Sequence, residues 1–184
     1  MRAFIAVDAS AIDPIARLQN EIGSSAGWSN MDVKPVEPQN FHFTLIFLGE
    51  ITYTDADRIQ SKLSGLRFDA IEISYNGVGA FPRPDEARIV WVGVDSDGSK
   101  RLAELATKVA SAVSELGFKP DKPFSAHLTI FRAKARRPVN IAGIVRKYAG
   151  LSINDRIDKV QLKKSELTPS GPVYSNVYTV EAGK

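Results

Sequence analysis

Residues 40–50 read NFHFTLIFLGE, an apolar run in which a histidine is followed two positions later by a threonine. The same H-x-T pattern occurs once more, in the segment SAHLTIFR at residues 125–132. His42 and His127 are the only two histidines of the chain. A short motif found once carries little weight, but the same motif around both histidines is hard to attribute to chance.

Both segments are predicted to be β-strands, because they are rich in Phe, Leu, Ile and Thr and have turn-forming residues on their flanks. In a strand, residues i and i+2 point to the same face. Each motif therefore directs an imidazole and a hydroxyl to one face, His42 with Thr44 and His127 with Thr129. The alternating residues face the opposite layer: Phe43, Leu45, Leu128 and Ile130. Two such strands side by side would present an acid–base site to one small anionic group.

The composition predicts a cytoplasmic globular protein. A length of 184 residues suits one compact domain, or two small lobes that share a core. The absence of cysteine excludes disulfides, thiolate metal ligands and cysteine nucleophiles, and it fits a reducing compartment. No apolar run approaches the roughly 20 residues that cross a bilayer, and the N-terminal segment MRAFIAVD has too short an apolar core for a signal peptide.

The net charge of +3 and the pI of about 9.1 make the chain modestly basic. Such an excess alone indicates little more than a solvated surface. Several basic residues, however, bracket the second motif, where a positive field would favour a phosphate-bearing partner. These residues are Lys119, Lys122, Arg132, Lys134, Arg136 and Arg137. The alternative is scattered surface charge.

Two halves of the chain show the same order of predicted elements: strand, helix, motif strand, helix, strand. In the first half these are a strand at 2–8, a helix at 11–22, the first motif, a helix opened by a capping box of Thr54 and Asp57, and a strand at 68–78. In the second half they are a strand at 89–94, a helix at 99–116, the second motif, a helix at 138–150 and a strand at 155–166. Long loops are predicted at 24–39 and, because of its prolines and glycines, at 79–84.

We therefore predict an α+β fold of two pseudo-symmetric lobes, each an antiparallel sheet with helices on its outer face, and a central cleft that carries both H-x-T-x motifs. The prediction is a single bilobal domain over residues 1–184 that arose by internal duplication. Its halves lie at roughly 1–80 and 86–167, and a final strand lies at 173–181. No flexible linker divides the halves, so we expect one folding unit.

Two imidazoles across a cleft suit an in-line displacement at phosphorus. Near neutral pH a neutral histidine can accept a proton from the attacking water, while a charged one protonates the departing oxygen. The pair predicts a bell-shaped dependence of rate on pH. The threonine hydroxyls and a nearby cation, with Arg132 as the leading candidate, can bind the non-bridging oxygens as negative charge builds.

Other kinds of site fit less well. A zinc site could use the two histidines, but hydroxyls at the +2 positions are weak zinc ligands. The chain has neither a Walker-type loop nor a G-x-S-x-G nucleophile elbow. We expect no metal and no cofactor. A purely structural interpretation also stands, in which both histidines are hydrogen-bonded core residues of two strands.

Several segments beyond the histidines contribute to a family resemblance. They are the FLGE that closes the first motif strand, Arg132 after the second motif, RAFIA at 2–6, GAFP at 79–82, Trp91, and GPVY at 171–174. Together with the two H-x-T-x motifs, they make the chain resemble the 2H phosphoesterase superfamily. Within it, the chain is most similar to bacterial and archaeal RNA 2′,3′-cyclic phosphodiesterases, also called 2′-5′ RNA ligases. The resemblance covers essentially the whole chain.

The resemblance implies hydrolysis of RNA 2′,3′-cyclic phosphate ends to 2′-phosphomonoesters without a metal, and the reverse, ATP-independent 2′-5′ RNA ligation at the same site. It implies His127 as the base for water and His42 as the acid for the 3′ oxygen. The implied partners are RNA ends or cyclic nucleotides, including tRNA fragments, bound by a monomer that contacts neither membrane nor metal. The alternatives are a phosphodiesterase for another cyclic or 2′-5′ linkage, such as ADP-ribose cyclic phosphate, and a non-catalytic module that binds RNA ends.

Phe47 holds the position in the first motif that Arg132 holds in the second, five residues after the histidine. The resemblance implies that this aromatic ring stacks on a nucleobase. Strict alternation would turn the fifth position away from the histidine. Either a bulge or the end of the strand must turn both residues inward, or they are core and surface residues respectively. Weaker candidates for the binding surface are Tyr174, Phe81 and Arg83.

Overall fold

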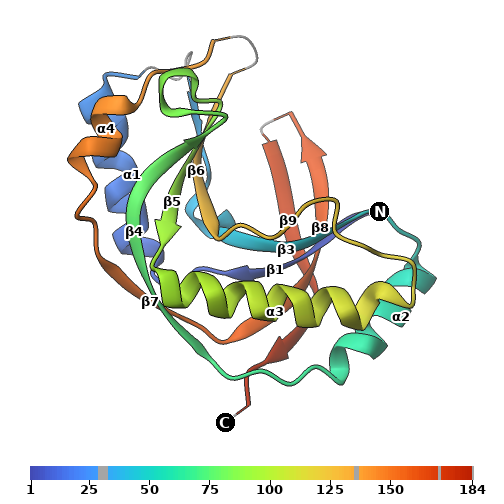
Figure 1. The fold of residues 1–184 in the computed structure, drawn as a ribbon. Coiled ribbons are helices and arrows are strands. Elements are labelled where there is room, and N and C mark those ends of the chain that lie inside the picture. The colour runs from blue at the N-terminus through green and yellow to red at the C-terminus, as the bar shows by residue number, and fades with distance from the viewer. Residues whose placement is uncertain (29–32, 135–136, 170, 184) are drawn as a thin grey trace.

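The strands of the protein form two antiparallel sheets (Figure 1). The computed structural model describes residues 1–28, 33–134, 137–169 and 171–183. The first sheet has the order β3 (His42–Glu50), β1 (Arg2–Asp8), β8 (Lys159–Thr168) and β9 (Gly171–Glu181). The second has the order β2 (Val33–Pro35), β6 (His127–Ala133), β5 (Ile89–Val94), β4 (Ile71–Phe81) and β7 (Ile153–Ile157). The predicted α+β fold of two similar lobes is confirmed.

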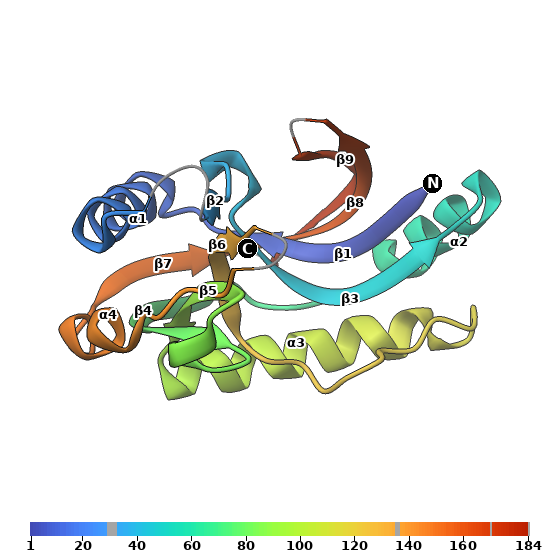
Figure 2. The same ribbon diagram turned by 90° about the horizontal axis from the view of Figure 1, so that it is seen from above.

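Helices flank the two sheets (Figure 2). They are α1 (Ile12–Ala26), α2 (Tyr53–Ser64), α3 (Ser96–Ser114) and α4 (Ala142–Lys147). α3 contacts β3 and β4, so it packs against strands of both sheets, and α2 lies beside α3. α1 and α4 lie together, where the Tyr148 hydroxyl donates to Glu21 at 2.7 Å. None of the helices in the described ranges is long and apolar enough to span a membrane.

The two halves of the sequence exchange their last strands. β1 lies between its motif strand β3 and β8, which comes from the second half. In the same way, β5 lies between its motif strand β6 and β4, which comes from the first half. The buried apolar residues of both sheets form one continuous cluster. Each sheet is thus built from both halves of the chain, an arrangement that periodicity along the sequence does not reveal.

Some predicted boundaries were wrong. The strand predicted at 155–166 is two strands, β7 and β8, which lie in different sheets. The loop predicted from residue 79 begins later, because β4 continues to Phe81. Gly77, with a φ of 67°, is the extra residue at a register shift between Asn76 and Val78, and Gly79 allows the Trp91 ring to lie directly against the backbone. Gly77 therefore serves the bulge and Gly79 the close packing of Trp91, and neither ends the strand.

Two further differences lie near the first motif. The long loop predicted at 24–39 contains the short strand β2 and a 3₁₀ turn, η1 (Pro38–Asn40), while its residues 29–32 lie outside the described ranges. The capping box that opens α2 uses Thr52 and Asp55, two positions earlier than predicted.

Candidate active site

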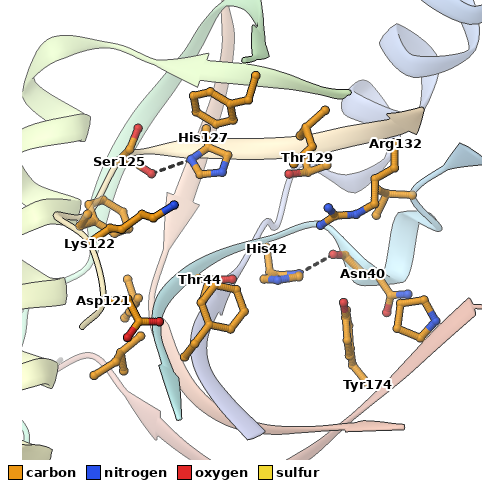
Figure 3. A pocket seen from close by; sticks show the side chains of 18 of the residues that line it. Asn40, His42, Thr44, Asp121, Lys122, Ser125, His127, Thr129, Arg132 and Tyr174 are labelled. Carbon is orange, nitrogen blue, oxygen red and sulfur yellow. Dashed lines mark hydrogen bonds between the residues drawn. The ribbon is translucent and has the colours of Figure 1, made fainter. Parts of the chain in front are cut away.

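A cavity of about 770 Å³ lies where the two motif strands meet. β3 and β6 belong to different sheets and contact each other. Except for Arg83, the side chains predicted for the site line this cavity: His42, Thr44, Phe47, Phe81, His127, Thr129, Arg132 and Tyr174. Figure 3 shows both motifs at its border. Both histidines are only partly buried, so they are not enclosed core residues.

Each motif strand contains a β-bulge directly after its threonine. The extra residue is Leu45 in β3 and Ile130 in β6. Because a bulge inserts one residue, the alternation of faces shifts by one position beyond it. The side chains five residues after each histidine, Phe47 and Arg132, therefore join the histidine and threonine on the cavity face.

The bulge in β6 is held from outside its own sheet. Gln19, a buried residue of α1, donates from Nε2 to the carbonyl of Ile130 at 2.6 Å and to the carbonyl of Val36 at 2.9 Å. The Ile130 carbonyl also accepts from the Val36 N–H at 2.9 Å. One amide group thus ties together the bulge that orients Arg132 and a backbone segment that lines the cavity.

Replacing Gln19 with leucine is expected to destabilise the fold by about 1–3 kcal/mol, because the Val36 carbonyl loses its buried donor. Urea unfolding measures the loss. The matched control is Gln60→Leu, which changes an exposed glutamine of α2 and should alter stability by no more than about 0.5 kcal/mol. Equal effects of the two substitutions would show that the Gln19 hydrogen bonds contribute nothing.

Both imidazoles are oriented by a backbone carbonyl two residues earlier. Nδ1 of His42 lies 2.6 Å from the Asn40 carbonyl oxygen, and Nδ1 of His127 lies 2.8 Å from that of Ser125. A carbonyl only accepts, so Nδ1 carries the hydrogen in both rings and Nε2 is left for a ligand. Sequence analysis did not identify Asn40 and Ser125 as site residues. The signal available for them was that each lies two residues before a motif histidine.

Burial lowers the pKa of both histidines, and each carbonyl contact opposes that shift. The positive charge of Arg132 lowers the pKa of both rings further. At His42, Asp8 raises the pKa and Lys163 lowers it. A bound phosphate anion would favour the protonated form of either ring, so each histidine can exchange a proton within a complex.

An aromatic ring packs edge-on against each imidazole. Tyr174 lies 5.4 Å from His42, with an interplanar angle of 89°, and Phe81 lies 4.9 Å from His127, at 88°. These two rings limit the tilt of the imidazoles besides lining the cavity. Phe47 is different, because 64% of its surface is exposed and available to a flat ligand.

The predicted basic residues are only partly gathered at the cavity. Arg132 and Lys122 line it, together with Lys34, which sequence analysis missed. Arg83 lies elsewhere and pairs with Asp85 and Glu86, while Arg136 is outside the described ranges. Within those ranges, no three His, Cys, Asp or Glu side chains are grouped as metal ligands would be.

The arrangement offers two proton-exchanging nitrogens, two hydroxyls and a guanidinium to one ligand. Within the described part of the chain, neither the Thr44 nor the Thr129 hydroxyl bonds to another protein group, and Figure 3 shows both motifs bordering the same space. Such a set can bind a phosphate group and move protons on either side of it.

Comparisons with known proteins agree with this geometry. The family described as LigT like Phosphoesterase matches the chain twice, over residues 5–91 and 92–174. An RNA 2′,3′-cyclic phosphodiesterase of Archaeoglobus fulgidus is 41% identical, with coverage of 98% of this chain and 100% of the relative. One of Aeropyrum pernix is 36% identical, with coverage of 91% and 94%.

A solved structure shares the fold. Escherichia coli LigT complexed with 3′-AMP superimposes with a TM-score of 0.78 at 21% identity, with coverage of 100% of this chain and 99% of that chain. The double match, the level of identity and the shared architecture lead to one conclusion. The chain belongs to the LigT-like phosphoesterases, the 2H phosphoesterase family that its two H-x-T-x motifs resemble.

Proposed function

We propose that this protein hydrolyses the 2′,3′-cyclic phosphate at RNA ends to a 2′-phosphomonoester, with His127 as base and His42 as acid. The observation that carries the proposal is that both Nε2 atoms are left free by their carbonyl contacts and border one cavity with Arg132. The names of the relatives support the choice of RNA 2′,3′-cyclic phosphate over other phosphodiesters.

In this mechanism Nε2 of His127 takes a proton from water as the water oxygen bonds to phosphorus. The bond between phosphorus and O3′ breaks on the opposite side, and O3′ takes the proton from Nε2 of His42. The products are a 2′-phosphate and a free 3′-hydroxyl, and solvent returns the histidines to their starting states. Arg132 and the hydroxyls of Thr44 and Thr129 stabilise the charge on the non-bridging oxygens. These protein groups handle every proton and charge, so no step calls for a metal.

The same site would also join RNA ends. A 5′-hydroxyl in the place of water gives a 2′-5′ linkage, and the strained cyclic diester supplies the free energy, so ATP is not needed. RNA fragments such as those of tRNA are suitable substrates for a cavity that is open to solvent. We propose that a monomer carries out these reactions, because one chain supplies both histidines, both threonines and Arg132 to the cavity.

The decisive experiment offers the protein short RNAs that end in a 2′,3′-cyclic phosphate, in the presence of EDTA, and separates 2′- from 3′-phosphate products. Release of the 2′-phosphate with undiminished rate in EDTA is the expected result. Parallel reactions with ADP-ribose cyclic phosphate and with a 2′-5′ dinucleotide test the alternative substrates. A protein that binds the RNA ends without turning over any of these substrates would be a binding module rather than an enzyme.

Replacing Phe47 with alanine is expected to raise KM for an RNA end about 5- to 150-fold with little change in kcat, since base stacking on an aromatic ring is worth about 1–3 kcal/mol. Steady-state kinetics on a cyclic-phosphate RNA measures the changes in KM and in kcat separately. Tyr53→Ala is the matched control, because Tyr53 is 77% exposed at the start of α2 and does not line the cavity. An equally small effect of both substitutions would remove Phe47 from the binding surface.

A further inference from the structure

A partly buried ion pair lies beside His42. Asp8, the last residue of β1, is the cross-strand partner of His42 in β3, so the two side chains extend from the same face of the first sheet. Lys163 reaches Asp8 from β8 on the other side of β1, with its Nζ 2.8 Å from Oδ2 of Asp8. Lys163 is in register with Phe4, so its side chain reaches along β1 to Asp8. Three adjacent strands thus bring a histidine, a carboxylate and an ammonium group together.

The surroundings of Asp8 and Lys163 strengthen the electrostatic field of the pair. The Lys163 side chain is only 6% exposed, and that of Asp8 is 32% exposed. The second carboxylate oxygen of Asp8, Oδ1, is buried and has no hydrogen-bond donor among the described residues. Charges shielded from water interact more strongly than those at a surface, and one oxygen of this carboxylate is not compensated by a donor.

The described residues of the second lobe contain no counterpart of this pair. The cross-strand partner of His127 is Gly93, which has no side chain. The carbonyl contact, the edge-on aromatic ring and the bulge occur in both lobes, whereas among the described residues such an ion pair occurs only at His42. It therefore breaks the pseudo-symmetry at the point where acid–base catalysis needs two histidines in different protonation states.

We propose that Asp8 and Lys163 are positioning residues that make the two histidines unequal, Asp8 by favouring the protonated form of His42 and Lys163 by limiting that preference so that the ring can still release its proton. The inference rests on the proposed function, in which His42 is the acid. The other polar or charged groups that face His42 are Arg132 and His127 from β6, Tyr174 from β9 and the Asn40 carbonyl, and the uncharged ring of Phe4 packs against it at 5.2 Å. Arg132 acts on both rings with the same sign, whereas Asp8 and Lys163 act on His42 and are not among the groups that act on His127.

The proposal is tested by measuring the titration of each histidine by NMR. The chain has only two, so the imidazole protons give two NMR titration curves, which the single variants His42→Ala and His127→Ala assign. Asp8→Asn is expected to move the midpoint of His42 to lower pH. Lys163→Met is expected to move it to higher pH, because the Asp8 charge is then unopposed. The curve of His127 should stay in place in both variants.

Matched controls come from the exposed ion pair between Lys159 and Glu181, which joins β8 to β9. Lys159→Met and Glu181→Gln change the net charge by the same amounts and should leave the His42 curve unchanged. Lys163→Arg keeps the charge and should leave the His42 curve in its original place. If Lys163→Met is too unstable to measure, Lys163→Gln removes the same charge. The proposal is overturned if Asp8→Asn and the loss of the Lys163 charge shift His42 in the same direction, or if neither shifts it.

The dependence of kcat/KM on pH separates this inference from the proposed function. With His42 as the acid, the alkaline limb of the profile should follow the His42 midpoint, downward in Asp8→Asn and upward in Lys163→Met. If the NMR midpoints move as expected and the alkaline limb does not, the ion pair acts as described and His42 is not the acid.

Discussion

Alanine in place of His42 or of His127 is expected to lower the turnover of a cyclic-phosphate RNA about 10²- to 10⁴-fold, because each imidazole transfers a proton in the transition state. The double variant should lose little more than the worse single variant, since the two groups act in one concerted displacement. Single-turnover kinetics at saturating RNA measures the chemical step without the contribution of binding.

Loss of an imidazole should leave the fold and the binding of the RNA end largely intact. Far-UV circular dichroism and the affinity for the 2′-phosphate product provide these controls. A variant that keeps its product affinity and also turns over within about threefold of the unmodified protein would exclude that histidine from the proton transfers.

Replacing Arg132 with alanine is expected to reduce kcat about 10²- to 10³-fold, the loss typical of removing one donor that stabilises transition-state charge. Lysine at this position should recover only part of the rate, because it keeps the charge but loses the planar fork that binds two phosphate oxygens. Removing the guanidinium should also raise the pKa of both histidines, because its charge lowers both. The whole pH–rate profile should therefore move to higher pH.

An exposed arginine provides the comparison for Arg132. Arg156 in β7 pairs with Glu72 at the surface and does not line the cavity. Arg156→Ala should leave kcat and the pH profile unchanged. If Arg132→Ala behaves in the same way, Arg132 is a surface residue of β6 and the anion must be bound by the threonines and the other cavity cations.

Local features of the chain were predictable where they depend on neighbours in sequence. The alternation of His42, Phe43, Thr44 and Leu45 settles which side chains share a face, because the period of a strand is two. The apolar stripe of α3 settles its buried face for a similar reason. The position of Phe47 was left open, because whether a strand contains a bulge depends on the hydrogen bonds of its partner strand.

Features that join distant segments were not predictable. Gln19 appears in the sequence as an ordinary polar residue of an amphipathic helix, yet its amide holds the bulge at Ile130. Asp8 appears as the polar end of a first strand, yet Lys163 lies against it across the sheet. Both contacts arise from the exchange of elements between the halves, which no spacing along the chain records.

The amino-acid sequence by itself determined which functional groups are available for catalysis: two histidines, each with a hydroxyl on the same face of a strand. It also determined the duplicated order of elements around them. Only the tertiary structure decided that these groups share one cavity and that paired bulges bring Phe47 and Arg132 to it. It also decided that, within the described ranges, an ion pair borders His42 and not His127. The physical reason is the distance along the chain over which each feature is decided. The direction of a side chain follows from local backbone geometry, whereas convergence on one ligand depends on how sheets built from both halves pack around a common core.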